Sequence, residues 1–119
     1  MLKKYFMEAI IEKIKNGEGL TPVEQLIMFC APERVELLEM YLFDGYSLCD
    51  MAQFVLFKMP ERVELFKLYV VQNNNYLCNC AELKMLDMPE RSELLEMYRS
   101  QGFELCDEAQ EKARELGLI

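Results

Sequence analysis

Apolar and polar residues follow the same order three times along the chain. The phrases are "APERVELLEMY" from Ala31, "MPERVELFKLY" from Met59 and "MPERSELLEMY" from Met88. A catalytic site needs one arrangement of unlike residues, whereas a stacked scaffold needs one unit that fits against copies of itself. The repetition therefore favours a scaffold.

Each repeat unit predicts two helices. In the first phrase Val35, Leu38 and Leu42 lie three and four residues apart, on one face of a helix that Gly45 ends. Proline and acidic residues near its start suit the first turn of a helix. The stretch "CDMAQFVLFK" at 49–58 is shorter and more apolar. It predicts a second, largely buried helix.

The repeat length is nearly constant. Pro32, Pro60 and Pro89 lie 28 and 29 residues apart, so the unit that begins near Met59 contains one extra residue. We expect this residue in the polar loop at 73–76. A loop absorbs an insertion at little cost, whereas an insertion in a helix would rotate its apolar face by about 100°.

A fourth, diverged copy of the unit begins the chain. Leu20 precedes Pro32 by twelve residues, as Leu48 precedes Pro60. The stretch 21–24, Thr-Pro-Val-Glu, has threonine at an N-cap, proline at the first helical position and glutamate at the third, which predicts a capping box.

These units predict an all-α fold in a single domain, 1–119. The expected architecture is a right-handed-type α-solenoid of about four helical hairpins and roughly eight helices. The repeats span approximately 1–30, 31–58, 59–87 and 88–119. Their phrases resemble the short helix-turn-helix tandem repeats, about 28 residues long, of bacterial or phage α-solenoid proteins. The resemblance is to this general class and transfers no site residues.

Composition limits the possible partners. Thirteen Lys and Arg against 21 Asp and Glu give a net charge of −8, which disfavours direct binding to nucleic acid or anionic lipid. No apolar run approaches the roughly 20 residues of a membrane span, and the first residues lack the apolar core of a secretory signal. We therefore expect a soluble cytoplasmic protein.

The residue types offer little for catalysis. Histidine, the commonest general base and metal ligand, does not occur. Cys78 and Cys80 are a close thiol pair, but their spacing differs from that of zinc knuckles. We expect no catalytic residue, metal site or cofactor, and hence no enzyme. Cys49, Cys78 and Cys106 take the place of Thr21 in their units, so we expect reduced thiols near helix N-caps.

The Pro-Glu-Arg triplets place an arginine at the same point of three units: Arg34, Arg62 and Arg91. Each arginine either pairs with a carboxylate of the adjoining unit or binds an acidic peptide or phosphate of a partner. The acidic composition favours the pairing, because exposed charge on a helix is usually a solvated face.

Apolar residues at helix ends and in loops are the other candidates for a partner surface: Leu42, Phe43, Tyr46, Val70, Val71 and Tyr76. They either pack between repeats, which we favour, or form an exposed strip. Five methionines at helical spacing are interpreted in the same way, as core residues that fill gaps: Met28, Met40, Met51, Met85 and Met97.

The sequence thus predicts a non-catalytic protein–protein interaction module that binds a peptide or a protein domain on one solenoid face. The alternative is a small acidic inhibitor, of phage anti-defence or antitoxin type, that blocks the basic nucleic-acid groove of a target enzyme. Self-association follows if the apolar edge of the N-terminal helix stays uncovered. That edge contains Tyr5, Phe6, Ile10, Ile11 and Ile14.

Overall fold

The structure is a computed structural model that describes residues 2–119, and their side chains from residue 6 onward. This part of the chain contains eight α-helices, one π-helical segment and no strands, which confirms the predicted all-α fold of eight helices. The elements are α1 (Leu2–Lys15), α2 (Pro22–Met28), α3 (Arg34–Phe43), α4 (Asp50–Leu56), α5 (Arg62–Phe66), η1 (Lys67–Gln72), α6 (Asn79–Met85), α7 (Arg91–Ser100) and α8 (Asp107–Glu115).

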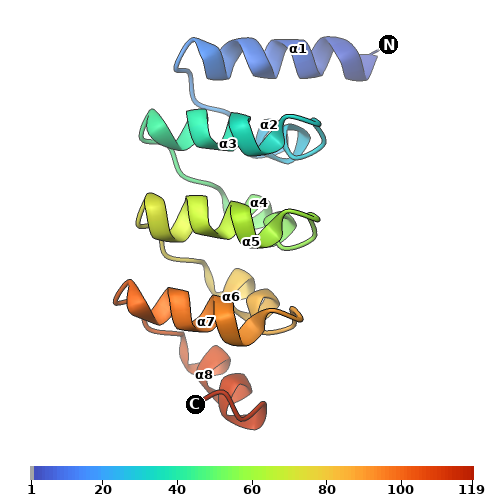
Figure 1. Ribbon diagram of the computed structural model, residues 1–119. Coiled ribbons are helices and arrows are strands. Elements are labelled where there is room, and N and C mark those ends of the chain that lie inside the picture. The colour runs from blue at the N-terminus through green and yellow to red at the C-terminus, as the bar shows by residue number, and fades with distance from the viewer. Residues whose placement is uncertain (1) are drawn as a thin grey trace.

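The helices lie in two rows (Figure 1). The first-helix row is α1, α3, α5 continued by η1, and α7; the second-helix row is α2, α4, α6 and α8. Successive members of each row are in contact, and one hydrophobic core runs between the rows from Ile10 to Ala113. We call the four pairs hairpins 1 to 4, from α1–α2 to α7–α8. The right-handed-type α-solenoid arrangement stays a prediction.

The stack is elongated, with extents of 47 × 26 × 20 Å. Its helices are short, because each one spans only the width of the stack. None of those within residues 2–119 is long and apolar enough to cross a bilayer.

Each helix of the second-helix row begins at the residue that the repeat alignment indicates. Thr21 is the N-cap of α2: its hydroxyl accepts from the Glu24 N–H, and the Glu24 carboxylate accepts from the Thr21 N–H. This confirms the predicted capping box. Cys49, Cys78 and Cys106 are the N-caps of α4, α6 and α8, as expected, although their thiols accept no capping hydrogen bond.

The extra residue of hairpin 3 lies in a helix, so its predicted place in the loop is wrong. Gly45 and Gly102 have φ of 91° and 87° and each follow a buried helix tyrosine by four residues, whereas Asn74, with φ of 54°, follows Tyr69 by five. The segment Lys67–Gln72 takes up the difference as a π-helix. A π-turn adds a residue to one wide turn, so the residues before it keep their register.

Candidate functional site

A buried polar network connects successive hairpins. In its central copy the Tyr69 hydroxyl accepts from the Leu48 N–H at 3.2 Å and from Gln53 Nε2 at 3.2 Å. Gln53 Nε2 also donates to the Leu48 carbonyl at 2.9 Å, and Gln53 Oε1 accepts from the Cys78 N–H at 2.8 Å. One glutamine thereby satisfies backbone groups of two loops and ties hairpins 2 and 3 together.

Sequence reasoning missed this network, although a signal for it exists. The position of Gln53, four residues after the N-cap of its helix, is occupied in all four units by an amide or carboxylate residue: Gln25, Gln53, Glu82 and Gln110. Tyr41 and Tyr98 repeat the role of Tyr69, and accept from the Leu20 and Leu77 N–H groups at 3.1 and 3.0 Å. Amide residues that recur inside apolar helices indicate buried hydrogen bonds, since an unpaired buried amide is costly.

Glu82 is the exception in this series, because a carboxylate replaces the amide at a site that is 3% exposed. Its Oε1 accepts from the Cys106 N–H at 2.8 Å, and its Oε2 accepts from the Tyr98 hydroxyl at 2.7 Å. Burial raises the pKa of the Tyr98 phenol, and the hydrogen bond to Glu82 adds to the rise. A carboxylate cannot donate to the Leu77 carbonyl as Gln53 donates to Leu48.

We expect Glu82→Gln to stabilise the fold by about 1 kcal/mol, because the new amide can donate to the Leu77 carbonyl and a buried charge is removed. The free energy of unfolding from urea titration measures the effect. Gln25→Glu is the converse change in hairpin 1 and should destabilise. A loss of stability in Glu82→Gln would show that the hydrogen bonds that the Glu82 carboxylate accepts contribute more stability than the new donation to the Leu77 carbonyl.

Two of the three arginines of the Pro-Glu-Arg triplets form ion pairs between hairpins. Arg34 Nε lies 2.9 Å from Glu61 Oε1, and Arg62 holds both carboxylate oxygens of Glu90 at 2.8 and 2.9 Å. These ion pairs connect hairpins 2, 3 and 4, which is the arrangement that the sequence favoured. The arginine hydrogen bonds lower the pKa of both glutamates. Arg91 is half-buried and has no ion-pair partner among the described side chains.

The cysteines are free thiols, as expected. The Sγ atoms of Cys78 and Cys80 lie 3.3 Å apart at the start of α6. Burial raises the pKa of the Cys78 thiol to about 12, and the hydrogen bond with Cys80 adds to the rise. A thiol that resists ionisation is a weak nucleophile and a weak metal ligand. No group of three or more potential metal ligands occurs among the residues described.

The apolar candidates fall into two groups. Leu42 and Val70 are buried, with 4% and 0% of their surface exposed, so they belong to the core between hairpins. Val71 is half-buried. Phe43 is 88% exposed and follows Leu42 directly, at the end of α3. The favoured packing between repeats thus holds for Leu42 and Val70, whereas Phe43 is exposed and the candidates form no continuous exposed strip.

The two loop tyrosines differ in the same way. Tyr46 stacks on Tyr41 with ring centroids 4.9 Å apart and donates its hydroxyl proton to the Gly17 carbonyl at 2.8 Å. It joins the loops of hairpins 1 and 2. Tyr76 is 71% exposed and touches Phe103 edge-on at 6.3 Å. Tyr46 is thus held by the fold, whereas most of Tyr76 faces solvent.

The methionines do not all fill the core as interpreted from the sequence. Met28 and Met85 are fully buried and Met97 is half-buried, but Met40 is 38% and Met51 58% exposed. The spacing of the methionines along the helices does not distinguish the buried ones from the exposed ones, because a core position and a groove position recur with the same helical period.

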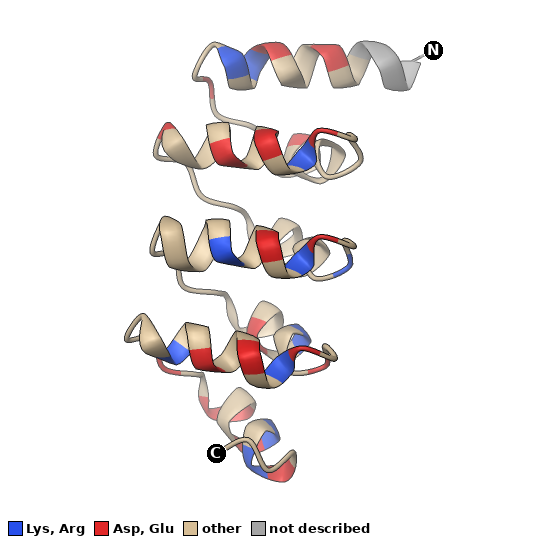
Figure 2. Cartoon of the chain, in the orientation of Figure 1, with Lys and Arg blue, Asp and Glu red and all other residues tan. Residues whose placement is uncertain are grey.

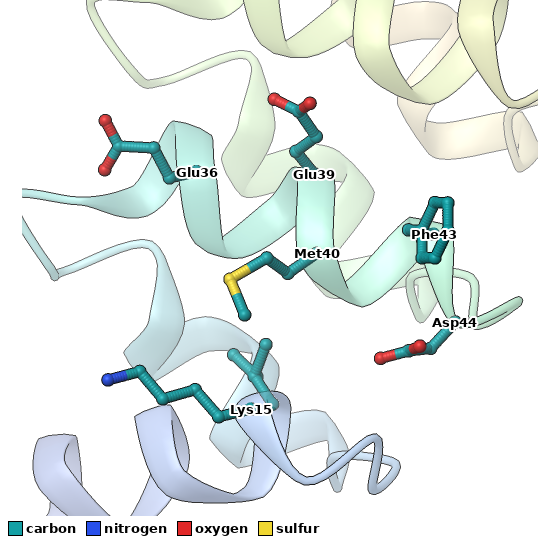
Figure 3. A pocket seen from close by; sticks show the side chains of 7 residues that line it. Lys15, Glu36, Glu39, Met40, Phe43 and Asp44 are labelled. Atoms are coloured by element: carbon teal, nitrogen blue, oxygen red, sulfur yellow. The ribbon is translucent and has the colours of Figure 1, made fainter.

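An open groove lies between α1 and α3 (Figure 3). Its volume is about 510 Å³, and its lining is Ile14, Lys15, Glu36, Glu39, Met40, Phe43 and Asp44. The Met40 side chain points toward α1, and Phe43 and Asp44 lie at one end of the groove. We call this the α1–α3 groove. Sequence reasoning named two of the lining residues for contacts with a partner or a second copy, Phe43 and Ile14, but did not bring them together in one groove.

A second groove with related residues lies between η1 and α7. Its lining includes Val71, Glu93, Glu96 and Met97. Glu93, Glu96 and Met97 stand at the same phase of the repeat as Glu36, Glu39 and Met40. The junction of α3 with η1 differs, because Leu68 replaces the methionine and is buried.

Acidic positions recur along the first-helix row, with basic positions beside them (Figure 2). Five glutamates of this row are exposed, and no described basic side chain forms an ion pair with them: Glu36, Glu39, Glu64, Glu93 and Glu96. Pairs three residues apart lie on one helix face, which explains the clustering within α3 and α7.

The apolar edge of the N-terminal helix is mostly covered. Ile10 and Ile14 are 1% exposed and Ile11 is half-buried, whereas Phe6 is 57% exposed. The side chain of Tyr5 lies outside the described residues. The possible self-association through this edge stays a prediction.

Comparison with known proteins gives no match to a protein-family model, to a curated protein or to a solved structure.

Proposed function

We propose that the protein is a non-catalytic interaction module that binds a peptide or a domain of another protein on its first-helix row. The stacked hairpins support this proposal, because repeated helical pairs form an extended surface on which neighbouring units offer similar side chains. The proposal assigns the α1–α3 groove as the main contact, and it assigns Arg34, Arg62 and the buried Leu42 and Val70 to the scaffold.

The exposure of Phe43 beside the groove is the observation that carries the proposal. This side chain is 88% exposed, the largest exposure among the large apolar side chains of the described chain, and it lines a groove beside Met40. Its exposure does not serve the fold. Covering a phenylalanine side chain contributes about 1.5–3 kcal/mol to an association. Exposed aromatic residues beside a concavity are typical of interface anchors.

The test is capture of partners from a lysate of the host cells on the immobilised protein, with identification by mass spectrometry. A partner bound through the first-helix row is expected to be lost in Phe43→Ser and retained in Met51→Ser. The second variant is a matched control, because Met51 is also apolar and exposed, at 58%, but lies on the second-helix row. Circular dichroism of each variant verifies that it is folded.

Loss of the partner in Met51→Ser, with retention in Phe43→Ser, would contradict the assigned face. A partner retained by both variants would contradict the role of Phe43 altogether.

A second candidate function is the acidic inhibitor that blocks a basic nucleic-acid groove of an enzyme. The observation in its favour is the row of exposed glutamates on α3, α5 and α7. Association through charge weakens steeply with salt, whereas association through apolar contacts does not. Capture of a nucleic-acid enzyme at low salt only, with no loss in Phe43→Ser, would favour the inhibitor, and a partner that is lost in Phe43→Ser would favour the interaction module.

A further inference from the structure

We propose that the α1–α3 groove binds a basic segment of its partner, in which lysine or arginine residues flank one apolar side chain. This inference rests on the proposed function and adds the chemistry of the partner. It combines two properties of the groove, its apolar floor and its carboxylate rim.

The floor is apolar and partly open to solvent. Ile14 of α1 is buried at its base, Met40 is 38% exposed, and Phe43 is 88% exposed at one end. A volume of about 510 Å³ accommodates a large aliphatic side chain together with part of the backbone that carries it. Methionine adapts its shape to such a guest because its side chain is unbranched and flexible.

The rim is predominantly acidic. Glu36, Glu39 and Asp44 are exposed carboxylates, and Lys15 is the one basic residue among the lining side chains. None of the three carboxylates forms an ion pair with a described residue. Three negative charges against one positive charge favour a cationic segment and disfavour an acidic one, since like charges across an interface are costly.

Another acidic surface of the chain lacks the apolar component. The residues Asp107, Glu108, Glu111 and Glu115 of α8 surround Leu83 and Lys112, and Leu83 is half-buried. This surface can attract a basic peptide by charge but offers no exposed anchor comparable to Phe43. Its lining carries four carboxylates and one lysine, one carboxylate more than the α1–α3 groove, so it provides a control for attraction by charge alone.

The experiment titrates the protein against fluorescein-labelled Lys-Lys-Leu-Lys-Lys at low salt, with fluorescence anisotropy as the readout. The double variant Glu36→Gln/Glu39→Gln is expected to weaken binding about tenfold or more, as is Phe43→Ser. Glu108→Gln/Glu111→Gln removes the same charge at the same spacing on α8 and should change the Kd by less than about twofold. Circular dichroism verifies that all variants fold.

Two further peptides test the two parts of the recognition. Gln-Gln-Leu-Gln-Gln keeps the apolar side chain without the charges, and Lys-Lys-Ala-Lys-Lys keeps the charges without the anchor. Both should bind at least about tenfold more weakly than the parent peptide. Equal binding of the glutamine peptide, equal loss in the two double variants, or no binding of the parent peptide would overturn the inference.

Failure of this inference and failure of the proposed function are distinguishable. If a lysate partner is lost in Phe43→Ser but the lysine peptide does not depend on Glu36 and Glu39, the interaction module stands and the basic-segment inference is wrong. If the peptide depends on the groove but no lysate partner depends on Phe43, the groove chemistry stands and the proposed function is contradicted.

Discussion

Phe66→Ala is expected to lower the free energy of unfolding by about 3–5 kcal/mol, as large-to-small changes of fully buried aromatic residues do. Phe66 ends α5, is fully buried and contacts Phe57 with ring centroids 6.1 Å apart. Phe57 follows α4, so this pair closes the junction between hairpins 2 and 3. The loss combines the transfer free energy of the ring with the cavity that it leaves. Urea titration by circular dichroism measures it.

The matched control is Phe43→Ala, the same substitution at a residue that is 88% exposed. It should change the stability by less than about 0.5 kcal/mol. Similar losses in both variants would mean that Phe43 is packed in solution, which would also remove the basis of the proposed function. Natural domains are stable by only about 5–15 kcal/mol, so the expected effect of Phe66→Ala is a substantial part of the total.

Gln53→Leu is expected to destabilise the protein by about 2–4 kcal/mol, although it replaces a polar core residue with an apolar one of similar size. The change leaves the Leu48 carbonyl and the Cys78 N–H without their partner, and Tyr69 loses one donor. Each buried backbone group left unpaired costs about 1–3 kcal/mol, and the added apolar burial offsets part of the loss.

Gln110→Leu is the control for this prediction. Gln110 stands at the same phase in hairpin 4, but its described hydrogen bond is a single donation to the Leu105 carbonyl at 2.8 Å, and it is half-buried. It should cost less than about 1 kcal/mol because water can replace the lost partner. Equal effects at the two positions would show that the glutamines act locally within their own hairpins and do not connect neighbouring ones.

Several features of the fold could be predicted because they repeat. The recurrence of one phrase indicates helical units, and the alignment with Thr21 places Cys49, Cys78 and Cys106 at N-caps, where the structure has them. The ion pairs of Arg34 and Arg62 were favoured from composition and repeat phase. Local patterns suffice where the same interaction recurs at each junction, because every unit has the same neighbours.

The insertion in hairpin 3 shows where this reasoning fails. Sequence favoured the loop, since a helix that gains a residue should rotate its apolar face. The π-segment Lys67–Gln72 avoids the rotation by confining the insertion to one wide turn. Tyr69 lies within this segment and still reaches the Leu48 N–H, so the tertiary hydrogen bond keeps its place. No local pattern in the sequence contains that constraint.

The candidate site shows the same division. Phe43 and Leu42 are adjacent and both apolar, and the sequence left open whether each packs or faces solvent. The packing of α3 against its neighbours buries Leu42 and leaves Phe43 exposed. The groove needs α1 and α3, which are separated in sequence by a complete helix. By itself the sequence determined the repeated helical units, their N-caps and the acidic balance, because these depend on neighbours along the chain. The tertiary structure decided the buried polar network, the π-turn and the groove, because these depend on which hairpin surfaces meet and which remain open to solvent.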